Sequence, residues 1–284
     1  MAGWDECDRL LAEVMGSTAG GHGRRFAGFS APQASSKASP PCTGEDLLFV
    51  EEEGEQVQVW PIKLGLGRLE EILSIRPGEI CEVYGAPGTG KTLLGLSVSA
   101  AACCASRPVL YVTVKDPPWA LAERLGSLAA ARQIDEAALE HVRIYQAMNF
   151  TDFAQILAAP EIFQDKQPLV IIDGLTTLLS PFTSATSWAH RWRFAWAWRS
   201  LRHVAMPRGA TARGACVLIL SHTVGEGSLA LGQLWTQCAS RRLELKPGCL
   251  EVKMAKRGLP NAHGQQQVPS SVDFVLCDAG VLCR

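Results

Sequence analysis

The sequence predicts an α/β fold in which a mainly parallel central sheet carries helices on both faces and is closed by strands at its C-terminal end. Two observations lead to this prediction. Apolar segments of strand length alternate with helical segments along most of the chain, which is typical of a parallel sheet buried on both faces. One such strand runs directly into a glycine-rich loop and an apolar helix, an arrangement that binds phosphate groups.

The chain length of 284 residues, 47% of them hydrophobic, suits one α/β domain with an appendage. We expect residues 57–284 to form the folded domain. Residues 1–56 are expected to be a flexible N-terminal segment, because residues 16–43 are rich in Gly, Ser, Ala and Pro. Residues 3–15 have the apolar spacing of a short amphipathic helix, which either docks on a partner or is a frayed terminus.

The first half of the domain shows the alternation clearly. Residues 66–73 are predicted to form a short helix that precedes a Pro77–Gly78 turn. Apolar runs predict strands at 80–84, 108–114 and 142–145, and the spacing of apolar residues predicts helices at 92–105 and 119–131. Thr151 and Asp152 are expected to cap a helix at 150–159.

The second half contains the most apolar strands. Residues 169–173 are apolar up to a final aspartate, and residues 216–220 form a similar run, so both are predicted to be strands of the parallel sheet. A tryptophan-rich helix is predicted between them at 187–204. The remaining elements are a helix at 228–239 and closing strands at 241–246, 249–255 and 272–283.

The glycine-rich loop matches the pattern G-x-x-x-x-G-K-[ST] at every fixed position. Its glycines let the backbone turn with positive φ and bring N–H groups close to a phosphate, Lys91 supplies a positive charge, and the Thr92 hydroxyl is a candidate Mg²⁺ ligand. The alternative is a glycine-rich turn with a chance lysine, which the flanking strand and helix disfavour. The predicted phosphate-binding residues are Gly85, Ala86, Pro87, Gly88, Thr89, Gly90, Lys91 and Thr92.

Asp173 ends the strand at 169–173 and is the second candidate Mg²⁺ ligand, together with Thr92. The alternative is an ordinary aspartate that begins a turn with Gly174. Because ligands of such sheets bind at the carboxyl ends of the strands, we expect Lys91, Asp173 and the pair Ser221–His222 to lie along one edge.

Charge and cysteine content disfavour a strongly basic nucleic-acid-binding protein, a zinc protein and a secreted protein. The net charge is −1 and the pI is about 6.6, so any contact with nucleic acid must be local or mediated by a partner. The 10 cysteines include no Cys-x-x-Cys pair and no zinc-ligand spacing, which favours buried thiols in a reducing compartment. We expect neither a signal peptide nor a membrane contact, because acidic residues near the start replace the positive charge of a leader and no apolar run is long enough to span a bilayer.

From about residue 62 onwards the chain resembles the RecA/RadA-type recombinases, and within them the eukaryotic recombinase paralogues, most of all the D-type paralogue. The resemblance implies a RecA-like P-loop NTPase core that binds ATP and Mg²⁺, acts in homologous-recombination DNA repair in the nucleus, and assembles with other paralogues into a hetero-oligomer. The residues that carry it are 66–73 and 78–83 before the loop, 109–112, 173–181, 231–235, 240–243 and 254–257.

Two departures from the family pattern concern ATP hydrolysis and recognition of the γ-phosphate. Lys115 stands where the active recombinases have the glutamate that activates the attacking water, with Asp116 beside it as a substitute if the loop shifts by one residue. Ser221–His222 replaces an Asn-Gln pair, and the resemblance implies that His222 reports the γ-phosphate, the alternative being a turn contact. The implied catalytic set is therefore Lys91, Asp173, Asp116 and His222, and we predict ATP binding with slow hydrolysis.

Contact with single-stranded DNA is expected to be weak or to go through partners. The family's two DNA loops correspond here to residues 180–187 and 223–230, and neither contains Lys or Arg. The helix from Trp188 to Arg202 alternates tryptophans with arginines, which fits a core-facing stripe, a partner interface or a base-stacking platform. A second basic group would be split between the two faces of the closing strands by strand alternation: Arg241, Arg242, Lys246, Lys253, Lys256 and Arg257.

The leading hypothesis is an ATP-binding recombinase paralogue that helps other paralogues to assemble the recombinase filament. The family's N-terminal helical domain is not evident, so the partner contact it makes would fall to residues 3–15. A second hypothesis is a self-sufficient DNA-dependent ATPase or strand-exchange recombinase, which Lys115 and the uncharged loops disfavour. A third is a small-molecule kinase, which would require a basic lid that the sequence does not show.

Overall fold

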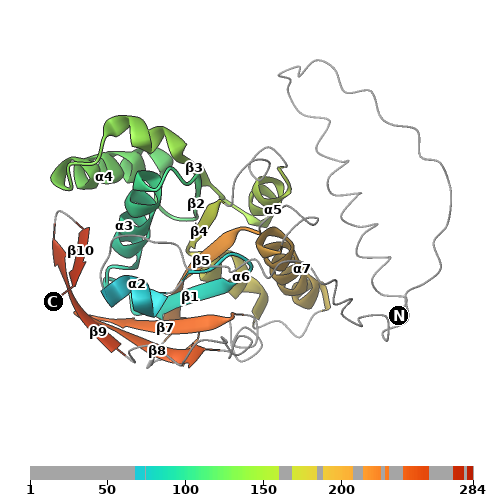
Figure 1. Cartoon of the computed structure of the whole chain (residues 1–284). Helices are drawn as coiled ribbons and strands as arrows, with labels where there is room; N and C mark the ends of the chain where they lie inside the picture. The colour runs from blue at the N-terminus through green and yellow to red at the C-terminus, as the bar shows by residue number, and fades with distance from the viewer. Residues whose placement is uncertain are drawn as a thin grey trace, which may run out of the picture. The chain divides into compact units, whose positions relative to one another are not determined.

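The computed structural model describes residues 68–73, 75–159, 168–183, 188–206, 214–224, 228–229, 239–255, 271–277 and 280–283. The predicted N-terminal segment 1–56 and its helix at 3–15 lie outside these residues. The described part of the chain forms an α/β fold around one sheet, as the sequence predicts (Figure 1).

The centre of the sheet is parallel and its last strands are antiparallel. Along the sheet the order is β10-β9-β8-β7-β1-β5-β4-β2-β3, with β6 paired to β5. All pairs from β3 to β7 are parallel, whereas β7, β8, β9 and β10 pair antiparallel. The strands are β1 (Ile80–Gly85), β2 (Val109–Thr113), β3 (Val142–Gln146), β4 (Leu169–Asp173), β5 (Cys216–Val224), β6 (Ser228–Leu229), β7 (Arg241–Lys246), β8 (Cys249–Ala255), β9 (Ser271–Cys277) and β10 (Gly280–Cys283).

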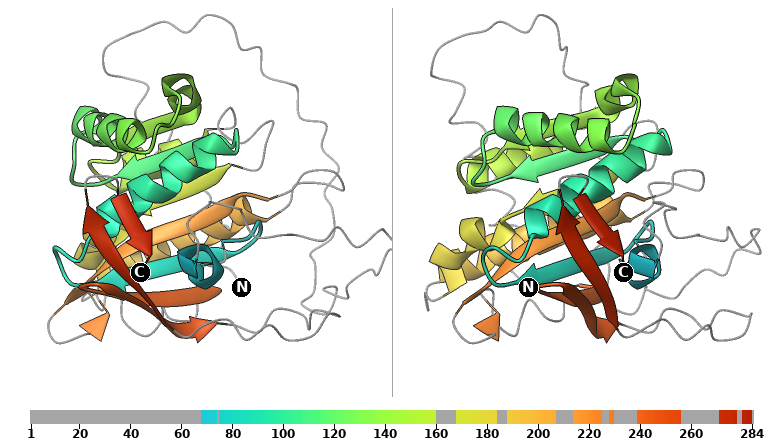
Figure 2. Two further views of the ribbon diagram at one scale, coloured as in Figure 1. Left: turned by 60° about the vertical axis from the view of Figure 1, so that its left-hand side comes forward. Right: turned by 90° about the vertical axis from the view of Figure 1, so that its left-hand side faces the viewer.

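Helices cover both faces of the parallel part (Figures 1 and 2). Alternate residues of β2 and β4 enter two apolar clusters, one beneath α3 and α4 and the other beneath α5, α6 and α7, because successive strand side chains point to opposite faces. Among the helices that the structure describes, none is both long and apolar enough to cross a membrane. The helices are α2 (Arg68–Leu73), α3 (Lys91–Cys104), α4 (Pro118–Ala131), α5 (Phe150–Ala158), α6 (Leu175–Thr183), α7 (Trp188–Ala205) and the 3₁₀ helix η2 (Glu136–His141).

The chain after β5 differs from the prediction. A helix was expected at 228–239, but Ser228 and Leu229 form strand β6, which pairs antiparallel with the end of a β5 that runs on to Val224. The β-branched Thr223 and Val224 favour this extension. The rest of that predicted helix lies outside the described residues. Residues 272–283, expected as one strand, are divided into the antiparallel pair β9 and β10.

The start of one helix and the end of another also differ from the prediction. Asn149, not Thr151 or Asp152, caps α5, because its side-chain oxygen accepts a hydrogen bond from the Asp152 N–H at 3.0 Å. The Asp152 carboxylate in turn accepts from the Met148 N–H at 3.0 Å. Residues 180–183, expected in a loop, are the last turn of α6, whose leucines at helical spacing bury against the apolar cluster.

Helix α3 lies so close to the sheet that a glycine is required in it, and α4 offers a matched comparison. A Cβ added to Gly95 would lie 2.8 Å from Leu220 Cδ1 and 3.1 Å from the Tyr111 hydroxyl, whereas one added to Gly126 would meet nothing within 4 Å. We therefore expect Gly95→Ala to destabilise the protein by about 1–3 kcal/mol through overpacking. Gly126→Ala should stabilise it by about 0.5–1 kcal/mol through helix propensity. Urea unfolding measures both, and equal effects would contradict the close approach of α3.

Candidate nucleotide-binding site

The phosphate loop, residues 85–92, connects β1 to α3 and has the backbone geometry that the motif requires. Gly88 and Gly90 have φ values of 81° and 95°, which only glycine adopts readily. Gly85 has a different role from the one predicted: it is not among the positive-φ residues, and a Cβ there would collide with the Leu245 carbonyl of β7. A Cβ on Gly90 would lie 2.6 Å from Leu276 Cδ1, so β9 packs against the loop.

Lys91 is the first residue of α3 and points back into the loop. Its Nζ donates to the carbonyl oxygens of Gly85 at 2.9 Å and Ala86 at 2.6 Å, and the residue is only 4% exposed. Burial lowers the pKa of the Lys91 ammonium, and nearby Asp173 acts in the opposite direction. Phosphate binding would let Lys91 exchange these neutral carbonyl acceptors for charged oxygens, which form stronger hydrogen bonds.

Asp173 joins the phosphate loop to the neighbouring strand β4. Its Oδ2 accepts hydrogen bonds from the Thr92 hydroxyl at 2.7 Å and the Tyr111 hydroxyl at 2.9 Å. Burial raises the pKa of this carboxyl, and the two hydrogen bonds partly offset that rise. Thr92 and Asp173 thus present two oxygen atoms at one point, which fits Mg²⁺, since this ion takes few protein ligands alongside substrate phosphates.

Sequence reasoning missed Tyr111 as a member of this site. Its side chain is fully buried in β2, and its hydroxyl has Asp173 as hydrogen-bond acceptor. Burial and the neighbouring carboxylate raise the Tyr111 pKa well above its ordinary value, so the hydroxyl stays a donor. A tyrosine within an otherwise aliphatic strand is a signal for such a contact, because a buried hydroxyl requires a partner.

His222 lies beside the phosphate loop and contacts Lys115. In the sheet His222 pairs with Gly85, and its Nε2 lies 3.3 Å from Lys115 Nζ. The His222 N–H donates to the Thr176 hydroxyl of α6 at 3.3 Å. Burial, followed by the charges of Lys91 and Lys115, lowers the His222 pKa, so the ring is neutral at neutral pH. Sequence reasoning placed His222 on this edge with Lys91 and Asp173 but did not predict its contact with Lys115.

Asp116, the predicted substitute base, lies in a tight turn after β2. The Thr113 hydroxyl donates to the Asp116 carbonyl at 3.0 Å and accepts from its N–H at 3.1 Å. Thr113, which begins this turn, pairs with Asp173 in the sheet, so Asp116 lies near the same edge. The structure therefore gathers Lys91, Asp173, Asp116 and His222 at one edge, while their catalytic roles stay predictions.

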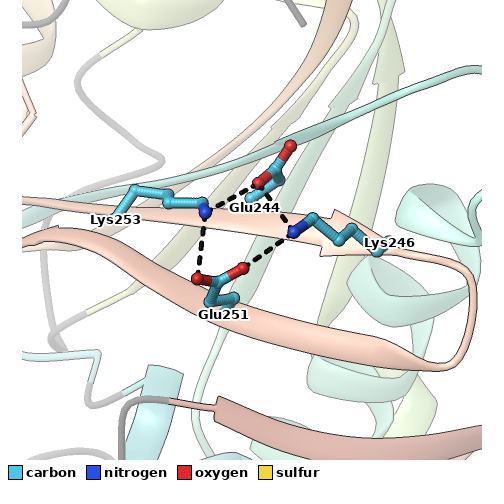
Figure 3. A network of polar contacts seen from close by, with 4 residues as sticks. All are labelled: Glu244, Lys246, Glu251 and Lys253. Atoms are coloured by element: carbon cyan, nitrogen blue, oxygen red, sulfur yellow. Dashed lines mark hydrogen bonds and ion pairs between the residues drawn. The ribbon is translucent and has the colours of Figure 1, made fainter.

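Most of the second basic group is paired with carboxylates where the structure describes it. On one face of β7 and β8, Lys246 and Lys253 pair with Glu244 and Glu251 at 2.9–3.5 Å (Figure 3). Arg242 and Glu82 form an ion pair of 2.6 Å in which both side chains are buried, and the guanidinium lies 4.9 Å from the centre of the Tyr84 ring. Arg241 donates to the Ile72 carbonyl at 2.8 Å. These cations already have partners, which disfavours a DNA-phosphate surface here. Lys256 and Arg257 lie outside the described residues.

The tryptophan-rich helix α7 packs on the sheet through its described part. Trp196 and Trp198 are half-buried against the apolar cluster, and Trp196 meets Phe150 edge-on with ring centres 5.3 Å apart. Arg202 lies 5.5 Å from the centre of the Trp198 ring. Among the three alternatives, these contacts favour the core-facing stripe for Trp196 and Trp198, whereas the side chains of Trp188 and Trp192 lie outside the description.

Comparison with known proteins gives a partial match. No protein-family model matches the chain. Part of it is similar to the DNA repair and recombination protein RadB from two strains of Halobacterium salinarum, with 30% identity over 115 residues. The aligned region covers 39% of this chain and 48% of RadB, so the chain spans about half the length of these relatives. The similarity supports the resemblance to RecA/RadA-type recombinases and agrees with the observed fold.

Burial of the Asp173 carboxylate should cost stability at neutral pH. Because its pKa is raised, the cost is present above the folded-state pKa and disappears as the pH falls below it. Asp173→Asn keeps an oxygen that accepts from Thr92 and Tyr111 but removes the charge. We expect it to raise the Tm without nucleotide at pH 7.5 by about 2–4 °C, with the gain vanishing near pH 4. Calorimetry measures this. Asp135→Asn, at an exposed helix cap, is the control, and an equal gain there would contradict the burial argument.

The buried pair of Glu82 and Arg242 should respond very differently to single and double replacement. Arg242→Met leaves the Glu82 carboxylate buried without its arginine, and we expect a loss of about 3–5 kcal/mol of unfolding free energy. The double variant Glu82→Leu with Arg242→Met removes both charges and should recover most of that loss. Denaturant unfolding of the four proteins of this cycle would disprove the expectation if the two single effects simply added.

Proposed function

We propose that this protein is an ATP-binding member of the homologous-recombination DNA repair machinery that assists recombinase filament assembly together with other recombinase paralogues. The observation that carries the proposal is the connection of the phosphate loop to the end of β4 through the hydrogen bond from Thr92 to Asp173. The partial similarity to RadB, a DNA repair and recombination protein, supports the biological setting. The D-type paralogue is the relative that the sequence pattern favours, and the nucleus is the expected compartment.

In this proposal the loop amides and Lys91 bind the phosphates, and Thr92 and Asp173 hold Mg²⁺. Bound Mg·ATP supplies a triphosphate whose terminal phosphoanhydride bond a positioned water can hydrolyse. The chain is poorly equipped to activate that water: a lysine ammonium at position 115 has no lone pair to accept a proton, and His222 carries a lowered pKa that makes it a weak base. Asp116 is the remaining candidate base, so hydrolysis is slow.

The described surface favours a partner over free DNA as the main contact. The lysines of β7 and β8 are paired with carboxylates, and the described tryptophans of α7 pack against the core. Since phosphate contacts dominate affinity for single strands, this chain binds single-stranded DNA weakly or through its partners. The nucleotide then acts as a ligand that stabilises the folded, assembly-competent protein, and its hydrolysis is not the source of energy for the function.

Binding and turnover of Mg·ATP by the purified full chain test the proposal. We expect Lys91→Ala to weaken ATP binding by about a hundredfold or more, because it removes a charged donor from the loop. Wild-type turnover should lie well below about 1 s⁻¹, the lower end of ordinary enzymes, both with and without single-stranded DNA. Isothermal titration and a phosphate-release assay provide the two measurements.

Lys253→Ala is the matched control, since it removes a lysine from the ion-paired face of β8 and should leave ATP binding unchanged. Failure of the wild type to bind ATP would refute the nucleotide-binding function. Rapid turnover stimulated by single-stranded DNA would refute the assembly role and favour a self-sufficient DNA-dependent ATPase with Asp116 as its base.

A further inference from the structure

Lys115 is a cation at the candidate nucleotide site and has no anionic partner among the residues that the structure describes. It is exposed just beyond the end of β2, and its Nζ contacts the neutral imidazole of His222 at 3.3 Å. Within the ranges that the structure describes, no carboxylate lies at ion-pair distance from its Nζ. An ammonium held against a neutral ring keeps its full positive charge available to an incoming anion.

The Lys115 side chain extends across the sheet edge toward the phosphate loop. Strand β4 lies between β2 and β5, so the Lys115 side chain reaches across the end of β4 to touch His222 on β5. At that end β4 continues into Gly174, which has no side chain, and the Val114 N–H donates to the Asp173 carbonyl at 3.1 Å. His222 itself pairs with Gly85, the first residue of the loop. The ammonium therefore ends beside the loop although it comes from β2, which lies three places from β1 in the sheet.

Electrostatics place Lys115, His222 and Lys91 around one space. Burial is the main cause of the lowered His222 pKa, and the charges of Lys91 and Lys115 lower it further. The two ammonium groups, which come from separate elements, therefore both disfavour added positive charge on His222. A polyanion bound there would relieve this repulsion, because opposite charges at short range favour the charged forms of basic groups.

One ring nitrogen of His222 also has no hydrogen-bond partner among the described residues. A lysine ammonium can only donate, so His222 Nε2 accepts from Lys115 and the ring proton sits on Nδ1. Nδ1 is buried and has no hydrogen-bond partner in the described part of the protein. A buried donor without an acceptor costs free energy, so the contact between Lys115 and His222 is one that a better acceptor can displace.

We propose that Lys115 and His222 form a clamp for the terminal phosphate of a nucleoside triphosphate, so that the protein binds the triphosphate much more tightly than the diphosphate. This inference rests on the nucleotide-binding part of the proposed function and adds to it the basis of ligand selectivity. The loop amides and Lys91 serve the inner phosphates. On binding, the Lys115 ammonium leaves His222 Nε2 for an oxygen of the terminal phosphate, and the released imidazole is free to reorient and donate to the same group.

The test compares two nucleotides on the full chain in the presence of Mg²⁺: ADP and a non-hydrolysable analogue of ATP. We expect Lys115→Met, which keeps the length of the side chain but removes its charge, to weaken binding of the analogue by about tenfold to a hundredfold. Binding of ADP, which lacks the terminal phosphate, should change by less than about twofold. Lys115→Arg should restore most of the selectivity, because it retains the charge.

Lys253→Met is the control for loss of a lysine elsewhere and should leave both affinities unchanged. Thermal shift provides a second readout: the analogue should stabilise the wild type more than ADP does, and this difference should shrink in Lys115→Met. Equal weakening of both nucleotides, or no change in either, would overturn the clamp even where Lys91→Ala still abolishes binding. If the wild type binds neither nucleotide, the nucleotide-binding function fails and the clamp fails with it.

Discussion

The hydrogen bond between the Thr92 hydroxyl and the buried Asp173 carboxylate is the contact on which the site depends. It fixes the start of α3 to the end of β4 across β5, which lies between β1 and β4 in the sheet. The Tyr111 hydroxyl of β2 donates a hydrogen bond to the same oxygen, and the two hydrogen bonds together orient the carboxylate. The apolar packing of α3 against β2 and β5 is therefore also what positions the candidate metal ligands, and the requirement for a glycine at position 95 follows from that packing.

The elements with strong periodicity were predictable, and the contacts between distant strands were not. Strands β1, β2, β4 and the helices α3 and α4 follow directly from apolar runs and leucine spacing, because local pattern and burial agree there. Strand β6 was missed because a two-residue strand forms only through its pairing with β5. The site residues in the loop and at Asp173 carry recognisable motifs, whereas Tyr111 and the contact between Lys115 and His222 depend on sheet order, which spacing along the chain does not reveal.

Charge is distributed unequally between the two regions of the sheet. On β7 and β8 every described lysine faces a glutamate, so that surface is close to neutral (Figure 3). At the carboxyl ends of β2 and β5, Lys115 and His222 share a contact without an acid. A protein with a net charge of only −1 can therefore present a strong local attraction for anions. Among the described residues this attraction lies at the edge where the phosphate loop lies, which favours a compact ligand over an extended polymer.

The packing of Leu276 against Gly90 has a consequence for the biogenesis of the protein. Strands β9 and β10 lie beside α3 (Figure 2), and Gly280 approaches Ser97 so closely that a side chain there would collide with it. A ribosome synthesises Gly90 long before Leu276, and domains of this kind complete their long-range contacts only when the whole segment has emerged. The contact that covers Gly90 of the phosphate loop therefore forms only after the final strands have been synthesised.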